Sequence, residues 1–419
     1  MDLSSYADFS ALIHQEVNGN RIPVNGTIEI THRCPLTCAH CYNNLPMGDQ
    51  DARKRELTFE EHCGIIDELA DLGCLWMLYT GGEIFARRDF LDIYTHAKKR
   101  GLLVTLFTNG TLITEAIADY LVEWPPFSIE ITLYGATRET YEALTGIPGS
   151  FDRCMRGIEL LIARKLPLSL KTVALSITRH ELGMMQEMAD RFGVDFKYDA
   201  MINPRIDCSS SPLAVRLTPP EIVSLDLQDE ERCGEWRKLA TSFAPVPPEP
   251  GEAQLYDCGG GINSFAIDPY GDMTICVLSK QDHFNVRGGK VSEAWWSFLT
   301  KVREKPATRL TKCTSCQLKS MCGICPANGE LENGDPEAPV DFLCRLAHLR
   351  ATALEIAIPS HGTCEYCADG VASHEIHSLM TDVHAIMAEP ATSSVVLRPP
   401  ASTGCGSGGC SSCSVSHAS

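Results

Sequence analysis

Short apolar runs alternate with longer amphipathic segments between residues 26 and 205. Apolar runs bounded by turn residues predict strands, whereas apolar positions repeating every three or four residues predict helices. The predicted strands are residues 26–31, 74–80, 102–108, 126–133, 168–176 and 195–202, and the predicted helices are residues 58–72, 90–100, 114–123, 150–164 and 179–192. Six strands with helices between them indicate right-handed crossovers and a parallel sheet. We therefore expect an α/β fold, a partial (βα)6 barrel of the TIM type that stops short of eight units.

The rest of the chain has a different character. Pro-rich and Ser-rich stretches follow residue 205, and a cysteine-rich region follows them, with little helical periodicity before its end. We expect an N-terminal extension (1–25), the barrel core (26–205), a linker region (206–256), a small cysteine-rich iron–sulfur domain (257–350), a C-terminal extension with a helix near 373–388 (351–400), and a disordered Gly/Ser/Cys-rich tail (401–419).

Charge and hydropathy limit the partners. The formal net charge is −18, and acidic residues are spread along the chain. Nucleic acids and anionic membranes need basic patches, so neither is expected as a partner. No apolar run approaches the 18 residues of a membrane span, and no secretory signal precedes the first strand, so a cytoplasmic protein is expected.

The chain has 20 cysteines, and several of them are clustered. Cytosolic proteins keep their thiols reduced, so clustered cysteines there indicate metal ligands or catalytic thiols. The first cluster, Cys34-x3-Cys38-x2-Cys41, directly follows the first predicted strand, where α/β folds place their ligand chemistry. Three thiolates can bind three irons of a [4Fe–4S] cluster and leave the fourth iron open. The alternative is a zinc site completed by His32 or His40, although structural zinc sites more often use paired CxxC knuckles.

With His40 before its last cysteine, this loop resembles the cluster loop of the radical SAM superfamily. A second motif supports the resemblance, since residues 80–83 read Thr-Gly-Gly-Glu at the end of the second predicted strand. In that family this element meets the amino group of S-adenosylmethionine. Gly81 and Gly82 would let the backbone approach the ligand, with Glu83 near its ammonium. Taken alone, the motif could equally be a turn with an exposed acid.

The resemblance implies two further cofactor contacts, Asn109 after the third strand and Thr132 at the end of the fourth. Turn chemistry explains the Asn-Gly pair at 109–110 equally well.

The resemblance also implies a reaction. Electron transfer from the reduced cluster cleaves S-adenosylmethionine, and the resulting 5′-deoxyadenosyl radical removes hydrogen from a substrate. The protein's part would be to place the reactants and exclude water.

A second group of cysteines lies between residues 258 and 344. On spacing alone, two structural zinc ribbons remain an alternative. Order and spacing resemble the SPASM extension of radical SAM enzymes, which carries auxiliary [4Fe–4S] clusters. By position, one auxiliary cluster would use Cys313, Cys316, Cys322 and Cys344, and the other Cys258, Cys276 and Cys325. Only two residues separate Cys322 from Cys325, where the family usually has three. The second set also lacks a fourth cysteine, so its cluster would have either an open iron or a non-cysteine ligand.

Family members of this type mostly modify peptides or proteins, so the resemblance implies a peptide maturase that acts on a peptide or protein substrate. Val277 after Cys276 argues against the sulfatase-maturing branch, which has an acid there. Only 25 residues precede the first strand, so a separate leader-recognition protein is expected, together with an electron donor such as flavodoxin or ferredoxin. The alternatives are cofactor biosynthesis of the tetrapyrrole type and a non-enzymatic zinc or electron-transfer protein.

Two further groups of cysteines lie near the C-terminus. His361, Cys364 and Cys367 could form a metal ligand set with His374 or His377, or a loop with reactive thiols. Because four well-placed ligands cannot be assigned, no dedicated metal is expected there. Cys405, Cys410 and Cys413 lie in the low-complexity tail, which could be plain disorder, a substrate-like segment or a thiol relay.

Overall fold

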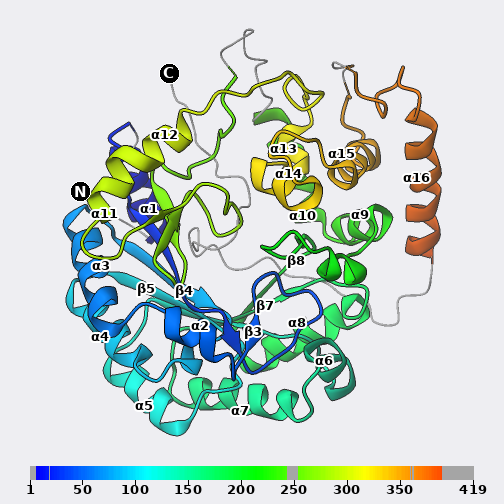
Figure 1. Ribbon diagram of the computed structural model, residues 1–419. Coiled ribbons are helices and arrows are strands. Elements are labelled where there is room, and N and C mark those ends of the chain that lie inside the picture. The colour runs from blue at the N-terminus through cyan, green and yellow to red at the C-terminus, as the bar shows by residue number, and fades with distance from the viewer. Residues whose placement is uncertain (1–5, 18, 243–252, 359, 361–362, 389–419) are drawn as a thin grey trace. The chain divides into compact units, whose positions relative to one another are not determined.

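The computed structural model describes residues 6–17, 19–242, 253–358, 360 and 363–388, and these residues form two units (Figure 1). The first unit contains the described residues up to Asp199 together with Gly259–Arg303. The second contains the described residues of Ala200–Cys258 and those that follow Glu304.

A parallel sheet forms the centre of the first unit. All six predicted strands are present, in the order in which they occur along the chain: β1 (Asn25–Thr31), β4 (Trp76–Gly81), β5 (Leu103–Thr108), β6 (Ser128–Thr132), β7 (Leu168–Val173) and β8 (Asp195–Asp199). The prediction of an α/β fold with a partial barrel is confirmed.

Helices lie around the outside of these strands (Figure 1). The predicted ones are α3 (Phe59–Asp71), α4 (Phe90–Lys99), α5 (Glu115–Glu123), α7 (Ser150–Ala163) and α8 (Leu182–Phe192), the last preceded by a 3-10 turn, η2 (Arg179–Glu181). Thr58 and Glu61 form a capping box at the start of α3, with the Thr58 N–H donating to Glu61 Oε2 at 2.8 Å. On the helix side of β1, Ile28 and Ile30 are fully buried, and burial of each contributes about 1.5–3 kcal/mol.

Several shorter elements of the first unit have no counterpart among the predicted ones. They are α1 (Tyr6–Val17), β2 (Arg33–Cys34), β3 (Leu45–Pro46), α2 (Gln50–Arg55), η1 (Ile84–Ala86), α6 (Arg138–Thr145), α11 (Val291–Glu293), η4 (Ala294–Phe298) and α12 (Leu299–Arg303). The pair β2–β3 matters most for function, because its register places Cys34 opposite Pro46 at the start of the first cysteine loop.

The sheet is larger than predicted. Three strands from the expected cysteine-rich domain, β9 (Ser264–Ile267), β10 (Asp272–Thr274) and β11 (Phe284–Asn285), extend it to nine strands. β9 pairs in parallel with β1, whose edge would otherwise present unpaired backbone groups. Residues 257–350 therefore do not form one domain, because Gly259–Arg303 belongs to the first unit and completes the barrel sheet.

The second unit is helical. It contains η3 (Ser211–Val215), α9 (Pro219–Leu227), α10 (Glu230–Ser242), α13 (Lys319–Cys322), α14 (Pro326–Asn333), α15 (Asp341–Ala353) and α16 (Ser373–Ala388). The helix expected near 373–388 is confirmed. The expectation of a linker over 206–256 needs correction, because α9 and α10 lie within it. Pro219 and Pro220 occupy the first turn of α9, where proline is tolerated, and Thr218 caps the helix. The expected tail at 401–419 lies outside the described residues.

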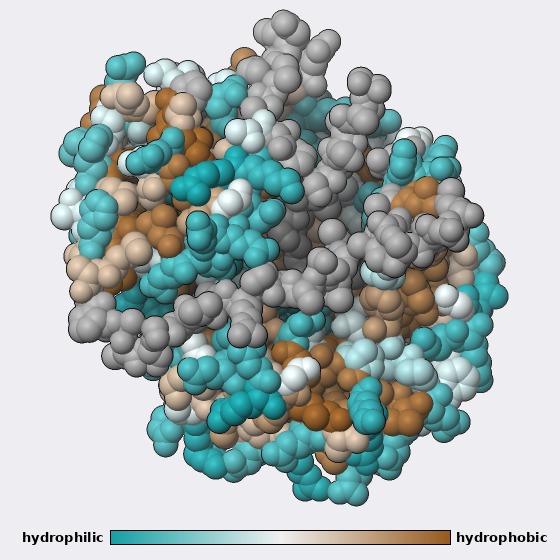
Figure 2. Space-filling model, turned by 180° about the vertical axis from the view of Figure 1, so that it is seen from behind, coloured by the Kyte–Doolittle hydropathy of each residue, from teal (hydrophilic) through white to brown (hydrophobic). Residues whose placement is uncertain are grey.

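Hydrophilic residues make up much of the surface visible in Figure 2, with apolar residues between them. Within the described part of the chain, no helix is both long enough and apolar enough to cross a membrane.

Candidate active site

The first cysteine loop begins where β1 ends. Cys34 is 8 % exposed, and its Sγ accepts a hydrogen bond from the Leu36 N–H at 3.5 Å. Burial raises the pKa of Cys34 to about 12, and the nearby carboxylate of Glu83 adds to the effect. Burial also raises the pKa of Cys38, and the neighbouring Cys41 and Cys34 contribute to that rise. The three thiols are therefore close enough to influence one another, and an ion that binds thiolates would relieve the cost of ionising them.

Two other predicted motifs meet this loop. The Asn109 side chain donates from Nδ2 to Cys34 Sγ at 3.5 Å, while its backbone N–H donates to Glu83 Oε2 at 2.8 Å. Thr108 Oγ1 donates to the same carboxylate at 2.7 Å. The structure thus brings together residues from the ends of β1, β4 and β5 that are far apart in the sequence.

Glu83 is 1 % exposed, and burial raises its pKa. Hydrogen bonds from Thr108 and Asn109 favour the charged form, but among the described residues no cationic side chain pairs with Glu83. A buried carboxylate without a cation is unfavourable unless a positively charged ligand completes the site. The arrangement therefore fits a ligand that carries an ammonium group.

Gly81 and Gly82 serve a purpose that the sequence did not indicate. Gly82 N–H donates to Thr31 O at 2.7 Å, and Glu83 N–H donates to Arg33 O at 3.1 Å. A Cβ on Gly82 would stand 2.4 Å from His32 O, and one on Gly81, at φ +129°, would stand 2.3 Å from Thr31 O. In this structure the glycines allow close approach of the backbone that leads into Cys34.

Aromatic side chains surround Cys38. The Tyr134 hydroxyl hydrogen-bonds the Cys38 thiol, and the Tyr134 ring lies 5.4 Å from the ring of His40. Tyr134 also interacts with Thr132, a predicted cofactor contact at the end of β6. The Nδ1 atom of His40 is buried without a hydrogen-bond partner among the described residues, so it could accept or donate a bond to a bound ligand.

The sequence predictions did not include a set of charged residues on the concave face of the sheet. Glu130 lies 3.1 Å from Lys171 Nζ and 2.9 Å from Lys197 Nζ. Phe107 pairs with Glu130 and Lys171 with Lys197 across neighbouring strands, and paired residues share a face of the sheet. Burial lowers the pKa of Lys171 to about 7, against the attraction of Glu130.

Glu29 holds the far end of the cysteine loop. Its carboxylate accepts from Asn43 Nδ2 at 2.6 Å and the Tyr42 hydroxyl at 3.2 Å, and it lies 3.3 Å from Lys280 Nζ. Burial opposes ionisation of Glu29, but Lys280 and His32 outweigh it and hold the pKa of Glu29 below its ordinary value. The sequence does contain a pattern that could have indicated both acids. Glu29 and Glu130 each stand at the centre of an Ile-Glu-Ile run, and a carboxylate inside an apolar strand is seldom buried without a binding partner.

The cysteines predicted for one auxiliary cluster converge in the second unit. Cys313, Cys316, Cys322 and Cys344 all line one small cavity, whose other lining residues include Lys312, Ile324, His348 and Cys364. Burial raises the pKa of Cys316 to about 11 and that of Cys322 to about 12. The cavity has the thiol lining that an iron–sulfur cluster requires.

The set predicted for the other auxiliary cluster is divided between the units, with Cys276 in the first and Cys258 and Cys325 in the second. That ligand set stays a prediction from spacing. No disulfide joins any of the cysteines in the part of the chain that the structure describes.

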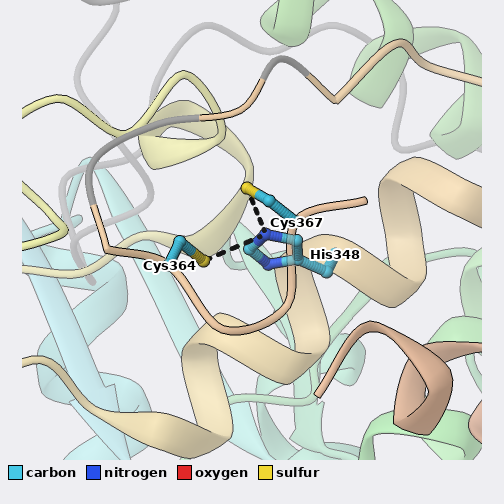
Figure 3. A group of neighbouring side chains, drawn as sticks. All are labelled: His348, Cys364 and Cys367. Carbon is cyan, nitrogen blue, oxygen red and sulfur yellow. Dashed lines mark hydrogen bonds between the residues drawn. The ribbon is translucent and has the colours of Figure 1, made fainter. Parts of the chain in front are cut away.

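The C-terminal cysteines differ from expectation. His361 lies outside the described residues, and it is His348, which the sequence analysis did not consider, that meets Cys364 and Cys367 (Figure 3). The histidine that contacts these two cysteines is therefore supplied by α15 and not by His374 or His377.

The fold and this geometry define an α/β-barrel enzyme with a thiol-lined site at the carboxyl ends of its strands. The model of the Radical SAM superfamily matches residues 28–189. Mycofactocin maturase MftC of Mycobacterium ulcerans is 30 % identical over 280 residues, which cover 65 % of this chain and 73 % of the relative. The chain belongs to the radical SAM superfamily, whose members bind S-adenosylmethionine and a [4Fe–4S] cluster.

Other relatives have related but different names. AdoMet-dependent heme synthase of Methanosarcina barkeri is 26 % identical, covering 73 % of this chain and 92 % of that protein. PqqA peptide cyclase of Bradyrhizobium diazoefficiens is 27 % identical, covering 80 % of this chain and 90 % of that protein. The crystal structure of Streptococcus suis SuiB shares the fold, with a TM-score of 0.59 at 15 % identity over 81 % of this chain and 83 % of that one.

Proposed function

We propose that this radical SAM enzyme modifies a peptide or protein substrate and that Cys34, Cys38 and Cys41 hold its first [4Fe–4S] cluster. The observation that carries the residue assignment is the hydrogen-bonded link between Cys34, Asn109 and Glu83. That link joins the cysteine loop to the Thr-Gly-Gly-Glu motif, as a shared cofactor site requires.

The roles of the chain's own residues follow from their positions. Glu83 would accept the ammonium of S-adenosylmethionine, and Asn109 would orient both that carboxylate and Cys34. Gly81 and Gly82 would set the distance between the two motifs, and Thr132 would act through Tyr134 at the edge of the site. When bound, the cluster and S-adenosylmethionine supply the 5′-deoxyadenosyl radical.

Charged residues on the concave face of the sheet would position the substrate. Glu130, Lys171 and Lys197 form a charged group within β6, β7 and β8, in which Glu130 is buried, Lys171 is half-buried and Lys197 is exposed. Ligands of parallel α/β sheets bind at the carboxyl ends of the strands, and this group lies two residues before the ends of β6, β7 and β8. Both signs of charge are present there, so the surface can bind the polar backbone and termini of a peptide.

An auxiliary [4Fe–4S] cluster on Cys313, Cys316, Cys322 and Cys344 is part of the proposal, supported by their shared cavity. A second auxiliary cluster on Cys258, Cys276 and Cys325 is supported by sequence spacing alone. Such clusters would carry electrons to or from the active site. A one-electron donor such as flavodoxin or ferredoxin, and a leader-recognition protein, are proposed partners.

A peptide substrate is favoured by the peptide cyclase among the relatives. The heme synthase among them keeps tetrapyrrole-type cofactor biosynthesis as the second candidate.

The test begins with radical formation. Anaerobically purified protein with S-adenosylmethionine and dithionite should form 5′-deoxyadenosine, and a variant with Cys34, Cys38 and Cys41 all changed to Ala should give no more than a protein-free blank. Cys63→Ala is the matched control, because Cys63 is a half-buried cysteine on α3 without a proposed ligand role. Unaltered turnover in the triple variant would remove the assignment.

The substrate class is tested with the active protein. A short peptide encoded beside the gene should change in mass, and deuterium placed in that peptide should appear in 5′-deoxyadenosine. Turnover of a tetrapyrrole with no change in any peptide would favour the second candidate instead.

A further inference from the structure

His348, Cys364 and Cys367 form a compact group of potential metal ligands in the second unit (Figure 3). His348 lies on α15, and both cysteines lie in the loop before α16. All three are buried, with 1 %, 7 % and 3 % exposure respectively. The ligand atoms of the three side chains lie within 4.8 Å of one another.

The histidine is oriented for metal binding. Its Nδ1 lies 2.8 Å from the carbonyl oxygen of Cys344, one helical turn earlier. A carbonyl can only accept, so Nδ1 carries the proton and Nε2 presents its lone pair to the two sulfurs. Metal-bound histidines are usually held by such a hydrogen bond from the other ring nitrogen.

The spacing fits a tetrahedral ion. Nε2 lies 3.5 Å from Cys364 Sγ and 3.8 Å from Cys367 Sγ. With zinc–sulfur bonds of about 2.3 Å and a zinc–nitrogen bond of about 2.0 Å, tetrahedral geometry gives nitrogen–sulfur separations of about 3.6 Å. The thiols of a [4Fe–4S] cluster each bind a different iron and stand further apart, so this group is better matched to a single ion.

The loop is shaped to hold its two cysteines. Gly370 N–H donates to Cys367 O at 2.8 Å, and a Cβ at Gly370 would stand 2.2 Å from Glu365 O. Tyr366, between the cysteines, accepts from Arg345 Nε at 2.9 Å and donates to Asp341 on the same helix as His348. The turn is therefore anchored against α15 by contacts that do not depend on a metal.

We propose that His348, Cys364 and Cys367 bind one divalent transition-metal ion of the zinc type. This ion is distinct from the cluster proposed on Cys313, Cys316, Cys322 and Cys344, although His348 and Cys364 also line the cavity of those four cysteines. Two sulfurs and one imidazole are a common zinc donor set, and a small ligand such as water takes the fourth position. The ion joins the 364–372 loop to the helix that carries Cys344. Glu365 of that loop also forms an ion pair with Lys312, at 2.7 Å, and Lys312 is the residue before Cys313. By fixing this loop, the ion would stabilise the residues around the thiol-lined cavity.

The experiment measures metals directly. Full-length protein is purified anaerobically without added iron, and iron and zinc per chain are determined by mass spectrometry. About one zinc per chain is expected. The double variant Cys364→Ser with Cys367→Ser, and separately His348→Gln, should lower zinc at least tenfold and leave iron unchanged. Cys313→Ser should lower iron and keep zinc, and Cys63→Ser should change neither.

Three results would overturn the proposal: a wild-type chain with less than a tenth of an equivalent of zinc, zinc that persists in the variants, or loss of about four irons in the double variant. The last would make these residues cluster ligands. X-ray absorption at the zinc edge of the wild-type protein gives a reading that does not depend on variant folding. Two sulfur neighbours at about 2.3 Å and a nitrogen near 2.0 Å are expected, and a shell with four sulfurs or with none would contradict the site.

Discussion

Arg33 and Glu56 form a buried, bidentate ion pair immediately before Cys34. Arg33 Nε lies 2.8 Å from Glu56 Oε1, and its Nη2 donates to Oε2 at 2.9 Å. Both side chains are less than a tenth exposed. The pair fixes the backbone that enters Cys34. Two parallel hydrogen bonds between a planar guanidinium and a carboxylate hold the relative orientation of the two side chains and also pair their charges.

Breaking this pair should lower both the unfolding free energy of the protein and its content of bound iron. We expect Arg33→Ala to lose about 3–5 kcal/mol in unfolding free energy, because it leaves a buried carboxylate unpaired. Denaturant titration and the iron content of the purified protein measure the two effects. Arg164→Ala, which breaks a pair with the largely exposed Asp119, is the control and should change little. Equal effects from the two changes would contradict the role given to Arg33.

Gly82→Ala tests the close approach of the two motifs. The new methyl group would stand 2.4 Å from His32 O and 2.6 Å from Arg33 O, so the cysteine loop has to move. We expect lower iron content and much less 5′-deoxyadenosine. Gly64→Ala, in helix α3 with nothing within 4 Å, is the matched control and should stabilise the protein by about 0.5–1 kcal/mol. A fully active Gly82→Ala protein would show that this spacing is not needed.

The sequence predicted the barrel well because its signals are local. Alternating periods, caps such as Thr58 with Glu61, and the position of Cys34 after an apolar strand depend only on neighbouring residues. The pairing of β9 with β1 and the meeting of His348 with Cys364 are long-range contacts, which periodicity does not encode. The Pro-rich composition after residue 205 favours a linker, although Pro219 suits the first turn of a helix.

Glu181 makes the stability of the barrel depend on pH. Its carboxylate accepts from the backbone N–H groups of Ala136 and Thr137 and from the hydroxyls of Thr137 and Thr140. Burial opposes ionisation of Glu181, but these hydrogen bonds outweigh it and hold the pKa of Glu181 below its ordinary value. Because the folded pKa is the lower one, this contribution is present above the unfolded value and is lost as the pH falls through the folded value.

Glu181→Gln should therefore cost about 2 kcal/mol near neutral pH and progressively less in acid, since the charged acceptor is already lost there. Unfolding free energies measured from pH 7 down to about pH 2, through the lowered folded pKa of Glu181, check this trend. Glu115→Gln on the exposed start of α5 should show no such convergence. A penalty that stayed constant with pH would mean that the charge of Glu181 is not the source of its effect.

Glu83 should determine the affinity for S-adenosylmethionine rather than the fold. Glu83→Gln keeps the shape of the side chain and an oxygen for Thr108, but it removes the buried negative charge that lacks a cationic partner among the described side chains. Hydrogen bonds to charged groups contribute about 1.5–3 kcal/mol, so the dissociation constant should rise at least about tenfold. Calorimetric titration of cluster-loaded protein measures it, with Glu123→Gln on the surface of α5 as the control. If Glu83→Gln bound the cofactor as tightly as the control at equal iron content, the ammonium would have to lie elsewhere and the buried charge of Glu83 would need another partner.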